Sequence, residues 1–135
     1  MRFVAVYLAV AVPFVLIDLV WLKVMGERMY QPTLRDILLP EPRLWPAAVF
    51  YLLYPLGLIG LAVMPAYQDG SAMRALVLGL MFGFFTYATY DLTNQATLRN
   101  WTNLLTITDV VWGTVLAACC ACSGYIVANR LLETP

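Results

Sequence analysis

The sequence predicts an all-α integral membrane protein built as a four-helix transmembrane bundle. Of its 135 residues, 62% are hydrophobic and 12% are charged, against roughly 25% charged residues in ordinary soluble domains. The apolar residues fall into four long runs, each close to the roughly 20 residues that a helix needs to cross about 30 Å of hydrocarbon. A membrane barrel would instead alternate over segments of about 10 residues. We expect a single membrane domain over residues 1–135, with helices over about 3–24, 45–66, 73–94 and 104–128.

The first apolar run also has the layout of a secretory signal, because Arg2 precedes its core. However, Asp18 and Lys23 follow that core where a small-residue cleavage site would stand, so we expect the run to remain as a helix. Pro13, near the middle of the run, predicts a kink and leaves the carbonyl of Ala9 without its usual helical donor.

The connection from Lys23 to Leu44 is long and polar, and it contains several prolines. Its apolar residues recur at helical spacing between charged side chains: Tyr30, Leu34, Ile37 and Leu38. This pattern is compatible with a short amphipathic helix in the membrane interface, and equally with an ordinary solvated loop.

Turn and packing signals place the next helices. Trp45-Pro46 opens the second helix, with tryptophan at the boundary where this residue is enriched and proline in a tolerated first turn. Residues 67–71 have the composition of a turn, so the second and third helices should be antiparallel neighbours. Gly79 and Gly83 lie four residues apart, a spacing that lets two backbones approach closely in lipid.

The third helix turns polar along residues 83–94 without any turn residue. At helical spacing its polar side chains form one stripe, which we expect to be an inner wall of the bundle: Thr86, Thr89, Tyr90, Thr93 and Thr97.

Three cysteines lie in the fourth helix, at positions 119, 120 and 122. A Cys-x-x-Cys pair suggests redox or metal chemistry, but such a dithiol needs a setting that stabilises the thiolate. These residues lie in an apolar helix about 15 Å of rise from Asp109, so we interpret them as small buried packing residues.

The topology brings scattered polar residues to one end of the bundle, here called side B, where the first and third helices end. The other end has almost no ionisable side chain. The residues expected at similar depth toward side B are Asp18, Tyr51, Tyr54, Tyr90, Asp91, Asn94, Thr106 and Asp109.

Two aspartates within the spans are each followed three residues later by tryptophan, as Asp18-x-x-Trp21 and Asp109-x-x-Trp112. A carboxylate at the centre of an inserted helix costs about 2.5 to 3.5 kcal/mol, so both should face the bundle interior. A structural role is the alternative, in which Lys23, Arg28 or Arg35 clasps these carboxylates. Asp91, near a helix end, is expected to pair with Arg99 or to cap the helix.

Composition also excludes several classes of function. The chain has no histidine, the commonest general base and metal ligand, and no metal cluster or cofactor site is expected. The net charge is zero and no basic cluster is present, which argues against nucleic acid as a partner. More Lys and Arg residues flank side B than the opposite end, which favours side B as cytoplasmic.

Motifs along nearly the whole chain resemble a bacterial family of predicted membrane proteins, the domain of unknown function 2177 family. The likeness is carried by residues 83–94 and 96–98, by Asp109-x-x-Trp112-Gly113 and Asp18-x-x-Trp21, and by Phe50-Tyr51-x-x-Tyr54-x-x-Gly57. The resemblance implies four helices and a multi-pass protein of the bacterial inner (cytoplasmic) membrane. The family has no assigned reaction, so no catalytic residue is carried over.

The function favoured is a binder or transporter of a small molecule or amphiphile, since carboxylates beside aromatic faces suit cations. Asp18 and Asp109 would bind the ligand or exchange it for protons, and the long loop would be the lid. The alternatives are a lipid-modifying enzyme and an accessory subunit of a larger membrane complex; enzymatic activity and homo-oligomerisation stay open. The candidate substrate-binding residues are Asp18, Trp21, Tyr51, Tyr54, Tyr87, Tyr90, Asp91, Asn94, Asp109 and Trp112.

Overall fold

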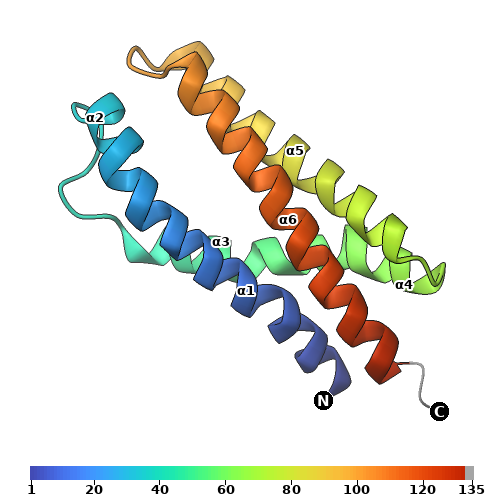
Figure 1. Ribbon diagram of the computed structural model, residues 1–135. Helices are drawn as coiled ribbons and strands as arrows, with labels where there is room; N and C mark the ends of the chain where they lie inside the picture. Colours follow the sequence, from blue (N-terminus) through green and yellow to red (C-terminus); the bar gives the residue numbers. More distant parts are fainter. Residues whose placement is uncertain (133–135) are drawn as a thin grey trace.

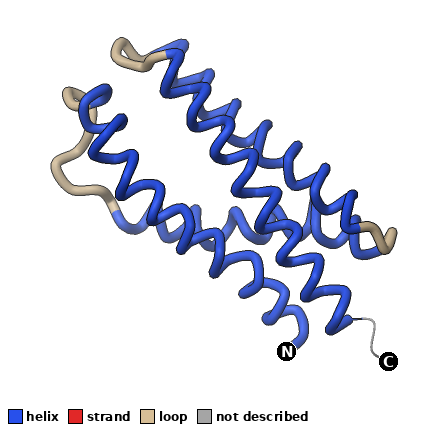
Figure 2. The backbone as a smooth tube through the Cα atoms, viewed as in Figure 1, coloured by secondary structure: helices blue, strands red, loops and turns tan. Residues whose placement is uncertain are grey.

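A computed structural model describes residues 1–132, and in that part of the chain every regular element is a helix (Figure 2). Four continuous helical segments, over residues 2–34, 44–68, 72–97 and 103–132, are long and apolar enough to cross a membrane. The predicted all-α class with four spans is therefore confirmed, although the last three residues of the expected domain lie outside the described part. The elements are α1 (Arg2–Met25), η1 (Gly26–Tyr30), α2 (Gln31–Leu34), α3 (Leu44–Leu58), η2 (Ile59–Val63), α4 (Met64–Gln68), α5 (Ala72–Thr97) and α6 (Asn103–Leu132).

The elements η1 and η2 are wide π-helical turns, and each stands directly before a residue followed by proline. At the end of η1 the Gln31 N–H donates to the carbonyl of Gly26, and Pro32 comes next. Proline has no N–H, and its ring collides with the carbonyl four residues earlier. A turn widened by one residue moves that carbonyl away, so the helix continues through the proline instead of breaking.

The sequence allowed either an interfacial helix or a solvated loop after the first span, and the structure differs from both. The first span continues without a break through η1 to Leu34, and Tyr30 and Leu34 belong to this extension rather than to a separate interfacial helix or a solvated loop. Only residues 35–43 connect it to α3.

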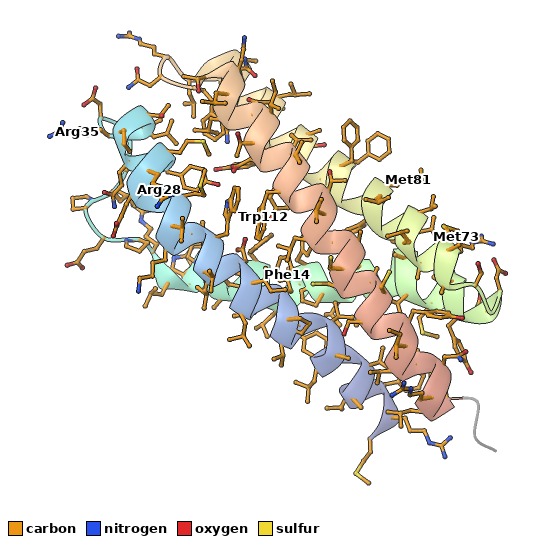
Figure 3. All side chains as sticks on the ribbon, viewed as in Figure 1. Phe14, Arg28, Arg35, Met73, Met81 and Trp112 are labelled. Carbon is orange, nitrogen blue, oxygen red and sulfur yellow. The ribbon has the colours of Figure 1, made fainter. Side chains whose placement is uncertain are left out.

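Figure 1 shows how the spans are arranged: α5 and α6 lie side by side as an antiparallel pair, α1 runs beside α6, and the segment from α3 to α4 crosses the others obliquely. The core lies where α1, α3 and α6 meet. Phe14 lies there (Figure 3) and is fully buried. Its ring stacks on that of Tyr54, with centroids 4.6 Å apart. The outer surface exposes many large apolar side chains, as contact with lipid requires.

The close approach of α5 and α6 depends on the two glycines that the spacing singled out. A Cβ atom at Gly79 would lie 2.8 Å from the Cα atom of Ala118 and 2.8 Å from the Cβ atom of Ala121. Gly83 meets the backbone of Gly113 and Thr114 in the same way. The predicted small-residue contact is confirmed.

Only part of the polar stripe of α5 is the inner wall that the sequence suggested: Thr86 is half-buried, with its hydroxyl 3.2 Å from that of Tyr54. Thr89, Thr93 and Thr97 are exposed, and each hydroxyl donates to the carbonyl four residues earlier, at 2.6, 2.5 and 2.9 Å. This back-bonding satisfies the hydroxyls without a partner helix, so they can face lipid. The face of α5 that packs inward is instead made of Ala75, Gly79, Gly83, Ala88 and Asp91.

The cysteines divide between two environments. Cys120 is buried in the core, as a packing residue should be, and Cys122 is half-buried. Cys119 is exposed on the helix surface, so the expectation of a buried packing residue is wrong for it. Consecutive helical positions differ by about 100° around the axis, which is why Cys119 and Cys120 cannot both face the core.

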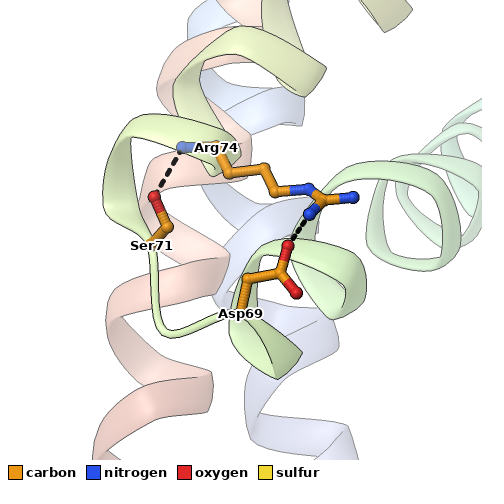
Figure 4. A network of polar contacts seen from close by, with 3 residues as sticks. All are labelled: Asp69, Ser71 and Arg74. Carbon is orange, nitrogen blue, oxygen red and sulfur yellow. Dashed lines mark hydrogen bonds and ion pairs between the residues drawn. The ribbon is translucent and has the colours of Figure 1, made fainter.

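The turn between α4 and α5 keeps the second and third spans antiparallel neighbours at this end, as predicted. Gly70 adopts φ 59°, a left-handed conformation that suits glycine. Ser71 caps α5 by accepting a hydrogen bond from the Arg74 N–H at 3.2 Å, and the Arg74 side chain forms an ion pair with Asp69 (Figure 4).

Pro13 lies inside α1 and has no N–H to donate to the carbonyl of Ala9. That carbonyl accepts a hydrogen bond from another helix instead. The Ser123 hydroxyl of α6 donates to the carbonyl of Ala9 at 2.8 Å. In lipid an unsatisfied carbonyl is costly, so this bond both stabilises the proline site and joins α1 to α6.

We predict that Ser123→Ala lowers the free energy of unfolding by about 0.5–1.5 kcal/mol, because it removes that bond. In a Pro13→Ala background the new N–H can donate to Ala9, so the same serine substitution should cost much less. Unfolding in mixed micelles measures this double-mutant cycle. Equal losses in both backgrounds would show that Ser123 does not act through the freed carbonyl.

Candidate functional site

Asp18 in α1 faces the interior and is 6% exposed. One carboxylate oxygen accepts a hydrogen bond from the Tyr51 hydroxyl of α3 at 2.7 Å, and the other accepts from the Trp112 indole N–H of α6 at 3.3 Å. Asp18 thus joins three spans through two uncharged donors.

Asp109 in α6 is also 6% exposed, and its partner comes from the π-helical turn after α1. The Tyr30 hydroxyl donates to Asp109 and accepts a hydrogen bond from the Trp21 indole N–H at 2.9 Å. The widened turn therefore delivers the side chain that connects the end of the first span to the fourth.

The two Asp-x-x-Trp segments dock on each other across α1 and α6. The indoles of Trp21 and Trp112 stack with centroids 4.1 Å apart and planes inclined by 6°. Trp112 reaches Asp18 directly, and Trp21 reaches Asp109 through Tyr30. The arrangement is reciprocal because the two helices are antiparallel: each tryptophan serves the aspartate of the opposite segment.

Beside this cluster lies a cavity of about 310 Å³, called here the acidic cavity. Both carboxylates reach it, and Figure 3 shows Trp112 directed from α6 toward α1. The remainder of its wall is aromatic or aliphatic. Its lining residues are Asp18, Trp21, Leu22, Tyr30, Leu34, Leu38, Tyr87, Tyr90, Trp101, Asp109 and Trp112.

Six of the ten residues proposed from the sequence line this cavity, and the other four have different positions. Tyr51 holds Asp18 through its hydroxyl. Tyr54 lines a neighbouring apolar groove, where its hydroxyl lies 3.2 Å from that of Thr86. Asn94 is half-buried and outside the cavity lining, and Asp91 is fully buried and also outside it.

The apolar groove adjoins the acidic cavity, because Tyr87 and Tyr90 line both. It has a volume of about 350 Å³ and no ionised side chain in its wall. Its other lining residues, Phe50, Tyr54 and Thr86, come from α3 and α5.

The charge partners weighed as an alternative for Asp18 and Asp109, and the one expected for Asp91, are not found in the described part of the chain. Within residues 1–132 neither Asp18 nor Asp109 has an ion pair, so Lys23, Arg28 and Arg35 do not clasp them. Figure 3 shows Arg28 and Arg35 at the α2 end of the molecule. Asp91 does not pair with Arg99, and neither of its oxygens has a hydrogen-bond partner in this part of the chain.

Sequence reasoning missed the contributions of Tyr30 and Trp101 to the site. Trp101, in the loop between α5 and α6, is buried and donates to the Thr106 hydroxyl at 3.0 Å. The sequence did contain a signal for Tyr30, since Tyr30, Leu34 and Leu38 recur every four residues. That spacing was interpreted as an interfacial helix or a solvated loop, whereas all three residues line the cavity.

The donor set limits what the site can hold. Among the described residues no three His, Cys, Asp or Glu side chains gather as metal ligands. The acidic cavity offers carboxylates, indole and phenol rings and hydroxyls, which suits a cation or a hydrogen-bond donor rather than an anion.

The fold and this geometry define a class: a helical membrane protein with four spans and an inward-facing acidic and aromatic cluster. The chain belongs to the family described as predicted membrane protein, domain of unknown function 2177, whose model matches residues 3–126. No curated protein and no solved structure matches the chain.

We predict that Tyr51→Phe lowers the free energy of unfolding by about 1–3 kcal/mol, because it leaves a buried carboxylate oxygen of Asp18 without its hydroxyl donor. Tyr7→Phe is the matched control, since the Tyr7 hydroxyl donates to the Leu52 carbonyl at an exposed site. Unfolding in mixed micelles compares the two. Equal effects would contradict a special role for the Tyr51–Asp18 bond.

Proposed function

We propose that this protein binds a small organic cation with an apolar tail in the acidic cavity and carries it across the membrane. One observation carries the proposal: Asp18 and Asp109 are buried at the same cavity, and within residues 1–132 both are held by uncharged donors alone. The hydrogen bonds orient the carboxylates without neutralising them. A cation that enters the cavity supplies the missing charge.

The aromatic wall supports the same ligand class. A cation within about 6 Å of an indole or phenol ring gains about 2 kcal/mol or more when it is desolvated. Trp21, Trp101 and Trp112 all line the cavity together with the carboxylates. The cavity volume of about 310 Å³ is that of a small-molecule site.

The apolar groove supports an amphiphile rather than a purely polar ion. Because Tyr87 and Tyr90 line both spaces, a molecule whose head lies against the carboxylates can place a chain along Phe50 and Tyr54. Leu38, in the connection to α3, lines the cavity from the loop, which supports the idea of this connection as a lid.

The location that we propose is the bacterial cytoplasmic membrane, with side B toward the cytoplasm. Four apolar helical spans support a location in a membrane. More Lys and Arg residues flank side B than the opposite end, which supports the orientation.

We predict that Asp18→Asn and Asp109→Asn each weaken binding of hexyltrimethylammonium at least about tenfold, equivalent to about 1.4 kcal/mol. Each substitution keeps the size of the side chain and removes its charge. Equilibrium dialysis against protein in zwitterionic lipid nanodiscs gives the affinity, and tetramethylammonium, which lacks the chain, should bind more weakly than the hexyl compound to the unmodified protein.

Asp69→Asn is the control, because Asp69 lies in the exposed turn before α5. The cavity residues of α5, Tyr87 and Tyr90, lie toward the other end of that helix. Unchanged affinity in the two cavity variants, with the protein inserted and monodisperse, would overturn the proposal. Failure of both variants to insert would show that the carboxylates serve the fold instead.

A further inference from the structure

Asp91 differs from the other two buried aspartates in having no donor at all. It is 0% exposed, and within residues 1–132 neither carboxylate oxygen accepts a hydrogen bond. Asp18 has two donors and Asp109 has one. A buried polar group without a partner is rare and calls for a physical explanation.

Among the residues that the structure describes, no Lys or Arg forms an ion pair with Asp91. It lies on the face of α5 that packs against α6, one helical turn beyond Ala88. The titratable group that acts on it is Asp109 from α6, and Asp91 in turn acts on Tyr90 of α5; both Asp109 and Tyr90 line the acidic cavity. Thr106, buried on α6, has its hydroxyl occupied by Gln95 and Trp101.

An ionised carboxylate in such a place costs several kcal/mol in lost hydration, and the charge of Asp109 adds repulsion. The protonated, neutral form of Asp91 avoids both the lost hydration and the repulsion. We propose that Asp91 is a proton site of this protein, and that binding of a cation at Asp109 releases its proton. The inference rests on the proposed function and adds the coupling ion: the protein exchanges an organic cation for a proton.

The exchange balances in atoms and charge. The O–H bond of the Asp91 carboxylic acid breaks, its electron pair stays on the carboxylate, and the proton passes to water and leaves toward side B. One positive charge enters the cluster and one departs. The cation offsets the negative charge of Asp109, which had favoured the proton on Asp91. By linkage the reverse holds equally, so protons at Asp91 weaken cation binding.

The first test measures protons released when hexyltrimethylammonium is added to the protein in weakly buffered nanodiscs with a pH-sensitive dye. The unmodified protein should release protons, up to one for each bound cation, because the cation offsets the repulsion from Asp109. Asp91→Asn should bind the cation with much less proton release, and its affinity should depend less on pH. Asp69→Asn should behave as the unmodified protein does. Equal proton release from Asp91→Asn and the unmodified protein would overturn the proposal.

A second test needs no ligand and separates this inference from the proposed function. Infrared spectra of the unmodified protein should contain the carbonyl stretch of a buried protonated carboxyl group, and Asp91→Asn should lack it. If no cation binds but this band disappears, the proposed function fails and the proton site stands. A band that persists in Asp91→Asn overturns the proton site. Should the asparagine variant not insert, Asp91→Glu must shift the band, and an unshifted band overturns the proposal equally.

Discussion

The docking of two Asp-x-x-Trp segments across α1 and α6 is the contact on which the arrangement of the spans depends. The stacked indoles fix the distance between the two helices, and the hydrogen bonds to Asp18 and Asp109 fix their rotation. Lipid offers no donor, so each carboxylate must find one inside. Tyr51 and Tyr30 meet that need, and in doing so they bring α3 and the extension of α1 to the same place.

The same constraint explains the backbone. In hydrocarbon a broken helix leaves polar groups unsatisfied, so the chain passes Pro32 and Pro65 on widened turns rather than stopping there. Ser123 supplies the donor that Pro13 lacks, and the exposed threonines of α5 bond to their own helix. These polar groups all have partners, whereas the carboxylate of Asp91 accepts no hydrogen bond within residues 1–132. This difference is the reason for placing the exchangeable proton at Asp91.

Much of this could be predicted from the sequence, and the failures have physical causes. Long apolar runs predict spans, and alternating directions predict that Asp18 and Asp109 reach similar depth. Side-chain contacts between helices could not be predicted, because periodicity gives the helix face on which a residue lies but not the residue that it contacts. The hydrogen bond from Tyr30 to Asp109 is an example. Asp91 was misplaced because a position near a helix end suggested the interface, whereas α5 continues to Thr97 and buries it.

The docked tryptophans can be observed directly by circular dichroism of the indole transitions. The coupled transitions of two indoles stacked 4.1 Å apart should give a pair of bands of opposite sign, whose size follows the rotation of one ring relative to the other. The account predicts that Trp21→Phe and Trp112→Phe each abolish this pair, while Trp45→Phe, at the exposed start of α3, leaves it intact. A signal that survives either cavity substitution would contradict the docking of the two segments.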